Sequence, residues 1–185
     1  LSGKSGSMTS ITPVITSKEN NINFRKLIDE GYNLLVKLEK GLSGADNVSL
    51  LGQMIVSSVV MAAMSRTNID KTQRKPYYLF VDEFQNFIKG DVGSALSEVR
   101  KYGLSMILAN QTLGQLQDAN NDVLQGLMGN VGSMIFFRPG INDYDKIKHF
   151  FEPDFDKSEV LKLPNFNCIG RIMTNNVPGD PFVFS

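Results

Sequence analysis

The clearest structural signal in the sequence is Tyr77-Tyr78-Leu79-Phe80-Val81-Asp82-Glu83-Phe84, because five apolar residues run directly into two adjacent carboxylates. The run is too short for a helix, and its unbroken apolar character predicts a strand buried on both faces. Charge is costly to bring close to a core, so Asp82 and Glu83 indicate where the strand leaves the sheet. In open parallel sheets, ligands bind just outside the carboxyl ends of the strands, which is where these two acids are expected.

This pattern has the form of a Walker B segment, in which two acids serve phosphoryl transfer. Asp82 is then expected to hold Mg²⁺, directly or through a water molecule. Glu83 is expected to orient and deprotonate the attacking water. Many strands end in acids, so the alternative interpretation is a solvated strand end without chemistry, and the neighbouring strands are needed to choose between the two.

The composition sets ordinary bounds on the class of protein. The 185 residues fit one domain with a sizeable core, and 42% hydrophobic with 21% charged residues describe a soluble globular protein. No apolar run is expected to reach membrane-spanning length, and no charged-then-apolar leader stands at the start. With 19 basic and 19 acidic residues the net charge is zero. Any contact with nucleic acid must therefore come from a local patch or an assembled ring.

Cysteine and histidine are each present once. Cys168 excludes an internal disulfide and suits a reducing compartment, and its apolar neighbours predict a buried side chain. His149 stands beside Lys148 in a predicted helix and is expected on a solvated face. The sequence shows no cluster of metal-ligating residues.

Residues 1–17 are rich in Ser, Thr, Gly and Lys without periodicity, and we expect a disordered linker there. Within them, Gly3-Lys4-Ser5 resembles the end of a P-loop. A complete P-loop needs an earlier glycine, a strand ahead of it and a helix after it. The chain therefore carries a Walker B candidate without a convincing Walker A, and residues 18–185 are expected to form the remainder of the domain.

Helix and strand signals alternate along the rest of the chain. Asn23 predicts the amino-terminal cap of a helix over residues 24–30, which Gly31 ends. Further helices are expected over residues 49–66, 91–102, 121–129, 143–151 and 157–163, and further strands over residues 32–38, 104–109, 132–137 and 166–174, with a last short strand ending at Ser185. This alternation predicts an α/β fold with a mainly parallel sheet, helices on both faces, and antiparallel strands at the carboxyl-terminal end.

Three successive strands end in polar side chains. Parallel strands place their carboxyl ends on one edge, so the pair Asp82-Glu83 should meet Gln111 and Arg138 there. Acids handle metal and water, an amide can sense the γ-phosphate, and a guanidinium can offset transition-state charge. Gln111 or Arg138 alone would suit a solvated loop, but together with the acids they favour phosphoryl transfer.

Two long motifs resemble a known family. They are Val81-Asp82-Glu83-Phe84-Gln85-Asn86-Phe87 and Leu96-Ser97-Glu98-Val99-Arg100-Lys101-Tyr102-Gly103-Leu104, the latter followed by Ile107-Leu108-Ala109-Asn110-Gln111. Both are similar to the ATPases of type IV secretion and conjugative DNA transfer, in the HerA/FtsK-like group of ring-forming RecA-like motors. Segments such as Gly129-Asn130-Val131-Gly132 and Leu163-Pro164-Asn165-Phe166 agree. The resemblance covers about residues 22–185.

The resemblance implies a RecA-like P-loop NTPase sheet and a hexameric, Mg-ATP-driven pump for DNA or protein at the cytoplasmic side of a bacterial inner membrane. Its partners would be other subunits of the ring, secretion-channel proteins at the membrane, and the transported substrate. Asp82 and Glu83 would be the Walker B pair, and Gln111 would be the sensor. Arg138 and Arg100 are candidates for reaching the nucleotide of a neighbouring subunit. The Walker A half of the family is absent, so this chain alone is expected to be inactive.

Two other interpretations remain. A non-catalytic RecA-like module could keep the fold and use its surfaces to dock onto a secretion apparatus. A Rossmann-type dehydrogenase is weaker, because no glycine-rich turn follows any predicted strand.

Overall fold

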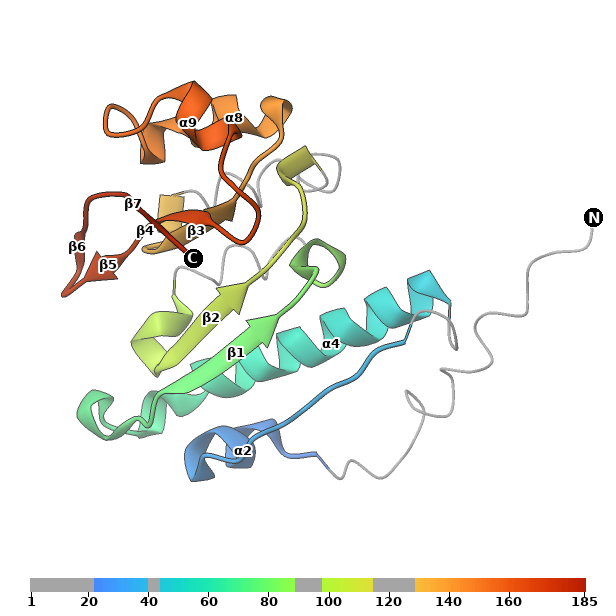
Figure 1. Ribbon diagram of the computed structural model, residues 1–185. Helices are drawn as coiled ribbons and strands as arrows, with labels where there is room; N and C mark the ends of the chain where they lie inside the picture. The colour runs from blue at the N-terminus through green and yellow to red at the C-terminus, as the bar shows by residue number, and fades with distance from the viewer. Residues whose placement is uncertain (1–21, 40–43, 89–97, 115–128) are drawn as a thin grey trace, which may run out of the picture. The chain divides into compact units, whose positions relative to one another are not determined.

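The computed structural model describes residues 22–39, 44–88, 98–114 and 129–185. The chain divides into two compact units, Leu1–Asn110 and Gln111–Ser185 (Figure 1). The predicted linker with its Gly3-Lys4-Ser5 segment, the predicted helix over residues 121–129 and most of the one over 91–102 lie outside the described residues.

The first described element of the first unit is the predicted short helix, α2 (Phe24–Glu30). The side chain of Asn23 accepts a hydrogen bond from Lys26 N at 2.9 Å. Gly31 ends the helix in the left-handed conformation, with φ of 82°. Both capping predictions are confirmed, because capping is decided by contacts within a few residues.

The main helix of the first unit is α4 (Ala45–Met64), which begins four residues before the predicted start. Its buried residues line one side, and Gly52 lies against the ring of Phe87. The expectation that no apolar run reaches membrane-spanning length needs correction. The segment Ala45–Asn68 is long and apolar enough by length and composition, although the core helix of a soluble protein meets the same criterion.

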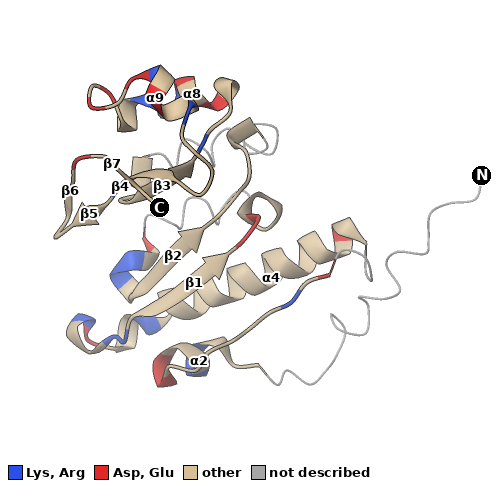
Figure 2. Ribbon diagram, in the orientation of Figure 1, with Lys and Arg blue, Asp and Glu red and all other residues tan. Residues whose placement is uncertain are grey.

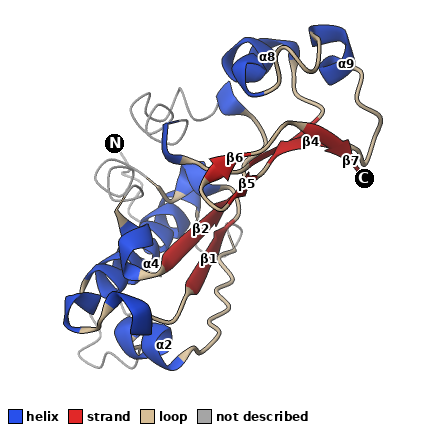
Figure 3. Cartoon of the chain, turned by 90° about the vertical axis from the view of Figure 1, so that its left-hand side faces the viewer, coloured by secondary structure: helices blue, strands red, loops and turns tan. Residues whose placement is uncertain are grey.

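The sheet of the first unit pairs β1 (Tyr77–Val81) with β2 (Leu104–Leu108) in parallel, from Tyr77 opposite Leu104 to Val81 opposite Leu108. The helix α4 runs along one face of this sheet (Figure 3). Three 3-10 turns, η1 (Arg66–Asn68), η2 (Lys71–Gln73) and η4 (Val99–Tyr102), precede the two strands.

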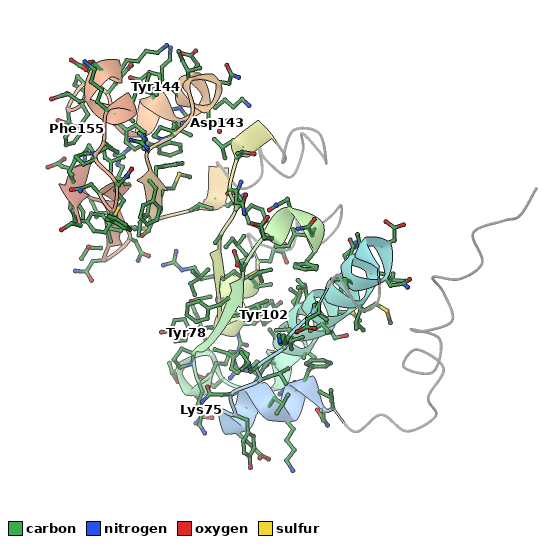
Figure 4. All side chains as sticks on the ribbon, turned by 45° about the vertical axis from the view of Figure 1, so that its right-hand side comes forward. Lys75, Tyr78, Tyr102, Asp143, Tyr144 and Phe155 are labelled. Carbon is green, nitrogen blue, oxygen red and sulfur yellow. The ribbon has the colours of Figure 1, made fainter. Side chains whose placement is uncertain are left out.

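The prediction that β1 is buried on both faces is wrong. Tyr77, Leu79 and Val81 are buried or half-buried, but the alternate residues Tyr78 and Phe80 are exposed, Phe80 at 73%. Tyr78 lies on the side of the sheet away from α4 (Figure 4). Successive side chains of a strand point to opposite faces, so Tyr78 and Phe80 share the face that is exposed.

The predicted strand over residues 32–38 is also not formed. These residues lie in no ladder of the described sheets, and Leu35 is 96% exposed. An apolar run becomes a strand only when another strand offers its free backbone groups, and that is a property of the whole sheet.

A buried arginine, Arg66, makes hydrogen bonds and an ion pair with several segments at the amino end of this sheet. Arg66 is 1% exposed, and its guanidinium donates to Lys75 O at 2.9 Å and to Tyr102 O at 2.8 Å. Its Nε lies 3.0 Å from Asp29 Oδ1 of α2. One side chain therefore links α2, the end of α4, the segment before β1 and the turn before β2.

The second unit has an antiparallel sheet in the order β3-β4-β7, made of Met134–Phe137, Cys168–Arg171 and Phe182–Phe184. A small hairpin pairs β5 (Met173–Thr174) with β6 (Val177–Pro178). Its helices within the described residues include α8 (Ile141–Ile147), η5 (Lys148–Phe150) and α9 (Lys157–Leu161). Phe136 of β3 packs edge-on against Phe151, with ring centroids 5.3 Å apart.

The sheet prediction holds in part. The fold is α/β and the carboxyl-terminal strands are antiparallel, but β1–β2 is the one parallel pair among the described strands. The expected parallel strand β3 instead pairs antiparallel with β4. The predictions for Cys168 and His149 are confirmed, since the thiol is buried and the imidazole is exposed.

Candidate functional site

The acid pair stands where β1 leaves the sheet, as the sequence predicts. Beyond the last strand pair, Ala109 N donates to Val81 O at 3.0 Å and Phe84 N donates to Ala109 O at 3.1 Å. Asp82 and Glu83 lie between these two hydrogen bonds, at the red tip of β1 in Figure 2. The chain after β2 therefore fixes where the two carboxylates emerge.

The backbone at Glu83 is unusual. It has φ of 50° in the left-handed region, which non-glycine residues rarely adopt. This conformation reverses the chain into the 3-10 turn η3 (Phe84–Asn86). Asn86 N and Asn86 Nδ2 both donate to Glu83 O, each at 3.0 Å. Backbone strain of this kind is found at functional sites, where the surrounding contacts hold it.

Each carboxylate has a defined contact. Asp82 Oδ1 accepts a hydrogen bond from Glu83 N at 2.9 Å. Glu83 Oε2 accepts one from Gln85 Nε2 at 2.6 Å. Asp82 is exposed, Glu83 is half-buried, and Gln85 is buried. The pair thus has one solvent-facing acid and one acid whose side chain is held by a buried amide.

The helix α4 packs against the η3 turn and holds it by a hydrogen bond. Ser49 Oγ donates to Asn86 O at 2.6 Å, and Gln53 Nε2 donates to Ser49 Oγ at 2.9 Å. Between these two residues, Gly52 leaves room for Phe87, because a Cβ there would lie 2.2 Å from Phe87 Cδ1. The turn that carries Glu83 is therefore seated on a regular helix.

The acids fit a magnesium ion shared with a nucleotide. Mg²⁺ keeps several waters and binds through one or two carboxylates together with substrate phosphates. Asp82, exposed with one oxygen engaged by a backbone N–H, meets that requirement. Among the described residues no group of three or more acidic, histidine or cysteine side chains could enclose a metal by itself.

The other predicted site residues have the following places. Arg100 lies in η4, before β2, so it is roughly 17 Å from the carboxyl end of the sheet at about 3.3 Å per strand residue. Gln111 is exposed at the start of the second unit. Arg138 follows β3 in that unit, and its guanidinium donates to Leu163 O at 3.4 Å and Asn165 Oδ1 at 3.1 Å. Asp82 and Glu83 lie together at the carboxyl end of the β1–β2 sheet, whereas Arg100 lies at the opposite end of the same sheet.

Gln85 was not predicted as a site residue. It stands inside the motif quoted above, but a sequence does not reveal that Glu83 turns back to meet it. The supporting residues Ser49 and Asn86 were missed for the same reason, because their contacts depend on the packing of α4 under η3.

Residues 76–150 match the family described as the TraM recognition site of TraD and TraG. Among solved structures, the chain is similar to the bacterial conjugative coupling protein TrwB in an unbound monoclinic form. The TM-score is 0.71 at 17% identity, over 90% of this chain and 44% of that one. The complex of plasmid coupling protein TrwB with the GTP analogue GDPNP gives 0.68 at 18% identity, over 87% and 43%.

The complex of TrwB with the ATP analogue ADPNP gives a TM-score of 0.62 at 18% identity, over 87% of this chain and 42% of that chain. No curated protein sequence matches the chain. The chain spans less than half the length of the TrwB chains that it resembles. The resemblance to the ATPases of conjugative transfer is therefore confirmed, with residues 76–150 matching the TraD and TraG family and the chain sharing the fold of the coupling protein TrwB.

Proposed function

We propose that this chain is the carboxyl-terminal part of an ATP-hydrolysing motor that drives DNA, or protein, transfer in a type IV secretion or conjugation system. One observation carries the proposal. The family match over residues 76–150 contains the acid pair, and the structure holds that pair in a strained turn at the carboxyl end of a parallel strand. Ligands bind at that edge in open α/β sheets.

The residues divide the chemistry as follows. Asp82 holds Mg²⁺, which would offset phosphate charge, and Glu83 orients and deprotonates the attacking water. Gln111 acts as the sensor of the γ-phosphate. Arg138 and Arg100 serve the nucleotide of a neighbouring subunit, and the distance of Arg100 from the acids of its own sheet supports action between subunits.

The assembly follows from the same family. The motor would be a homohexameric ring that uses Mg-ATP and works with channel proteins at the cytoplasmic side of a bacterial inner membrane. TrwB has been solved with both a GTP and an ATP analogue, which supports nucleotide binding by a protein of this fold.

The 185-residue chain by itself would not hydrolyse ATP. Affinity for a triphosphate comes from the backbone N–H groups and lysine of a phosphate loop. Asp82 and Glu83 without that loop repel a triphosphate unless Mg²⁺ lies between them.

A docking module is the second candidate function. The family that matches residues 76–150 is known as a recognition site, which is a binding role and not a catalytic one. In this alternative the fold would be kept for its surfaces, and the acid pair would have no role in hydrolysis.

The Glu83→Gln variant separates the two functions in a longer protein that carries a phosphate loop. The substitution keeps the size of the side chain and removes the base. If the motor function is right, nucleotide binding survives and turnover falls by roughly a hundredfold or more. Turnover at an unchanged rate would exclude Glu83 as the base and favour the docking module.

Titration calorimetry with Mg-ATP tests the isolated chain. We expect at best millimolar binding, weaker than about 4 kcal/mol, and no measurable ATPase activity. Micromolar binding would show that Gly3-Lys4-Ser5 is a working phosphate site and that the interpretation of the amino terminus is wrong.

A further inference from the structure

We propose that Gln85 is a positioning residue for the Glu83 carboxylate, a role that rests on the proposed ATPase function. Gln85 Nε2 donates to Glu83 Oε2 at 2.6 Å, and the glutamine side chain is buried. The two side chains meet because the left-handed backbone at Glu83 folds η3 back toward it. The hydrogen bond therefore depends on the strained turn that marks this site.

The contact leaves the carboxylate asymmetric. Glu83 Oε2 is engaged by Gln85, while within the described residues Glu83 Oε1 accepts no hydrogen bond. A general base must present one free oxygen within hydrogen-bond reach of the water that it deprotonates. Fixing the other oxygen orients the free one, and a neutral amide does this without placing a charge beside the base.

The backbone on both sides of Gln85 is held by regular elements. Asn86, the next residue along η3, has its carbonyl bonded to Ser49 of α4, and Phe84 N is bonded to Ala109 O at the end of β2. Side chains that orient a functional group work when packing and hydrogen bonds fix their own position. Gln85 meets this condition, because its side chain is buried and the residues before and after it are fixed by hydrogen bonds.

Nuclear magnetic resonance on the 185-residue chain tests the contact without any enzymatic activity. The hydrogen-bonded side-chain amide proton of Gln85 should be shifted downfield and protected from solvent exchange. The Glu83→Ala variant should lose both properties. The exposed Gln73 supplies an unprotected reference signal in the same spectrum. An unprotected Gln85 amide in the unsubstituted chain would overturn the proposal.

Steady-state kinetics on the longer, phosphate-loop-containing ATPase tests the role. Gln85→Met keeps the length of the side chain and removes the amide, and Gln85→Leu is a second variant in case the first misfolds. We expect kcat to fall about ten- to hundredfold with an unchanged KM for Mg-ATP, as when an outer-shell partner of a functional group is removed. Gln73→Met, the same change on the surface, should have no effect.

A double-mutant cycle separates positioning from general stability. In the Glu83→Gln background, Gln85→Met should cause no further loss, because the carboxylate that it orients is gone. An equal loss in both backgrounds would mean that Gln85 only supports the fold. A rise in turnover would mean that Gln85 restrains Glu83, and either result overturns the proposal. Full activity of Glu83→Gln alone would instead overturn the proposed function.

Discussion

Replacing Arg66 by alanine should destabilise the first unit more than any other single charge deletion at its amino end. The guanidinium is buried, and its loss leaves the carbonyls of Lys75 and Tyr102 without their donor. The substitution also removes one of the two cationic partners of Asp29, so that this carboxylate keeps only its ion pair with Arg25 at the surface. Three separate elements would lose their common contact.

The loss in the free energy of unfolding can be estimated from the contacts of Arg66. Two lost hydrogen bonds to a charged donor contribute about 1.5 kcal/mol each, and breaking a buried ion pair costs about 3–5 kcal/mol when a charge is left uncompensated. The pair with Asp29 is a charge contact without an aligned hydrogen bond among the described residues, and Asp29 keeps Arg25, so its share is small. We expect a total loss of about 4 kcal/mol for Arg66→Ala.

Urea unfolding followed by circular dichroism measures this loss, with an unchanged m-value as the sign that the unfolded state is the same. Arg66→Lys, which keeps the charge but not the forked donors, should lose about half as much and guards against complete unfolding of the alanine variant. Arg25→Ala is the matched control. Its guanidinium donates to Ser65 O and Asn68 Oδ1 at the surface, and its loss should cost about 1 kcal/mol. An Arg66→Ala effect no larger than that of Arg25→Ala would show that the buried guanidinium contributes no more to stability than the one at the surface.

Three further predictions concern packing, pH and assembly. Gly52→Ala should lower the free energy of unfolding by about 1–3 kcal/mol, because its Cβ would collide with the ring of Phe87. Thermal melts should show recovery on adding Phe87→Leu. Burial, with the Glu152 hydrogen bond, raises the pKa of Tyr144 above its ordinary value of 10.0. The unfolded chain therefore ionises first, so stability falls as the pH rises beyond 10. Tyr144→Phe should flatten that fall in denaturation curves. Arg138→Ala in the longer ATPase should abolish turnover while nucleotide affinity remains. Mixing with Glu83→Gln subunits should restore some turnover, and no recovery in assembled rings would mean that Arg138 acts inside its own subunit or only packs against Leu163 and Asn165.

The parts of the fold that the sequence predicts well are those decided by near neighbours. The helix between Asn23 and Gly31 is marked by its two capping residues, and both act within one turn. The end of β1 is marked by Asp82 and Glu83, since two charges cannot follow the strand into the core. In each case the residue type and the local structure have the same cause.

The parts that the sequence does not predict depend on distant partners. Residues 32–38 and Tyr77–Val81 are both short apolar runs, yet Tyr77–Val81 forms a strand and residues 32–38 do not. The difference is that β1 has β2 beside it, and the periodicity of an apolar run contains no information about its neighbour. Arg66 gives a similar lesson. A basic residue after an apolar helix suggests a solvated end, but its guanidinium is buried because carbonyls from two other segments converge on it.

Within the described residues, the acid turn is held by contacts from its own unit. They come from β1, η3, α4 and the end of β2, through Ala109, Gln85 and Ser49 with Asn86. A left-handed residue persists only where such contacts over-determine it. In the proposed motor, the acid side of the site is therefore already formed before a phosphate is bound. A phosphate loop would have to supply affinity for the nucleotide but would not have to reorganise the base, which is the condition under which electrostatic and general-base catalysis are most efficient.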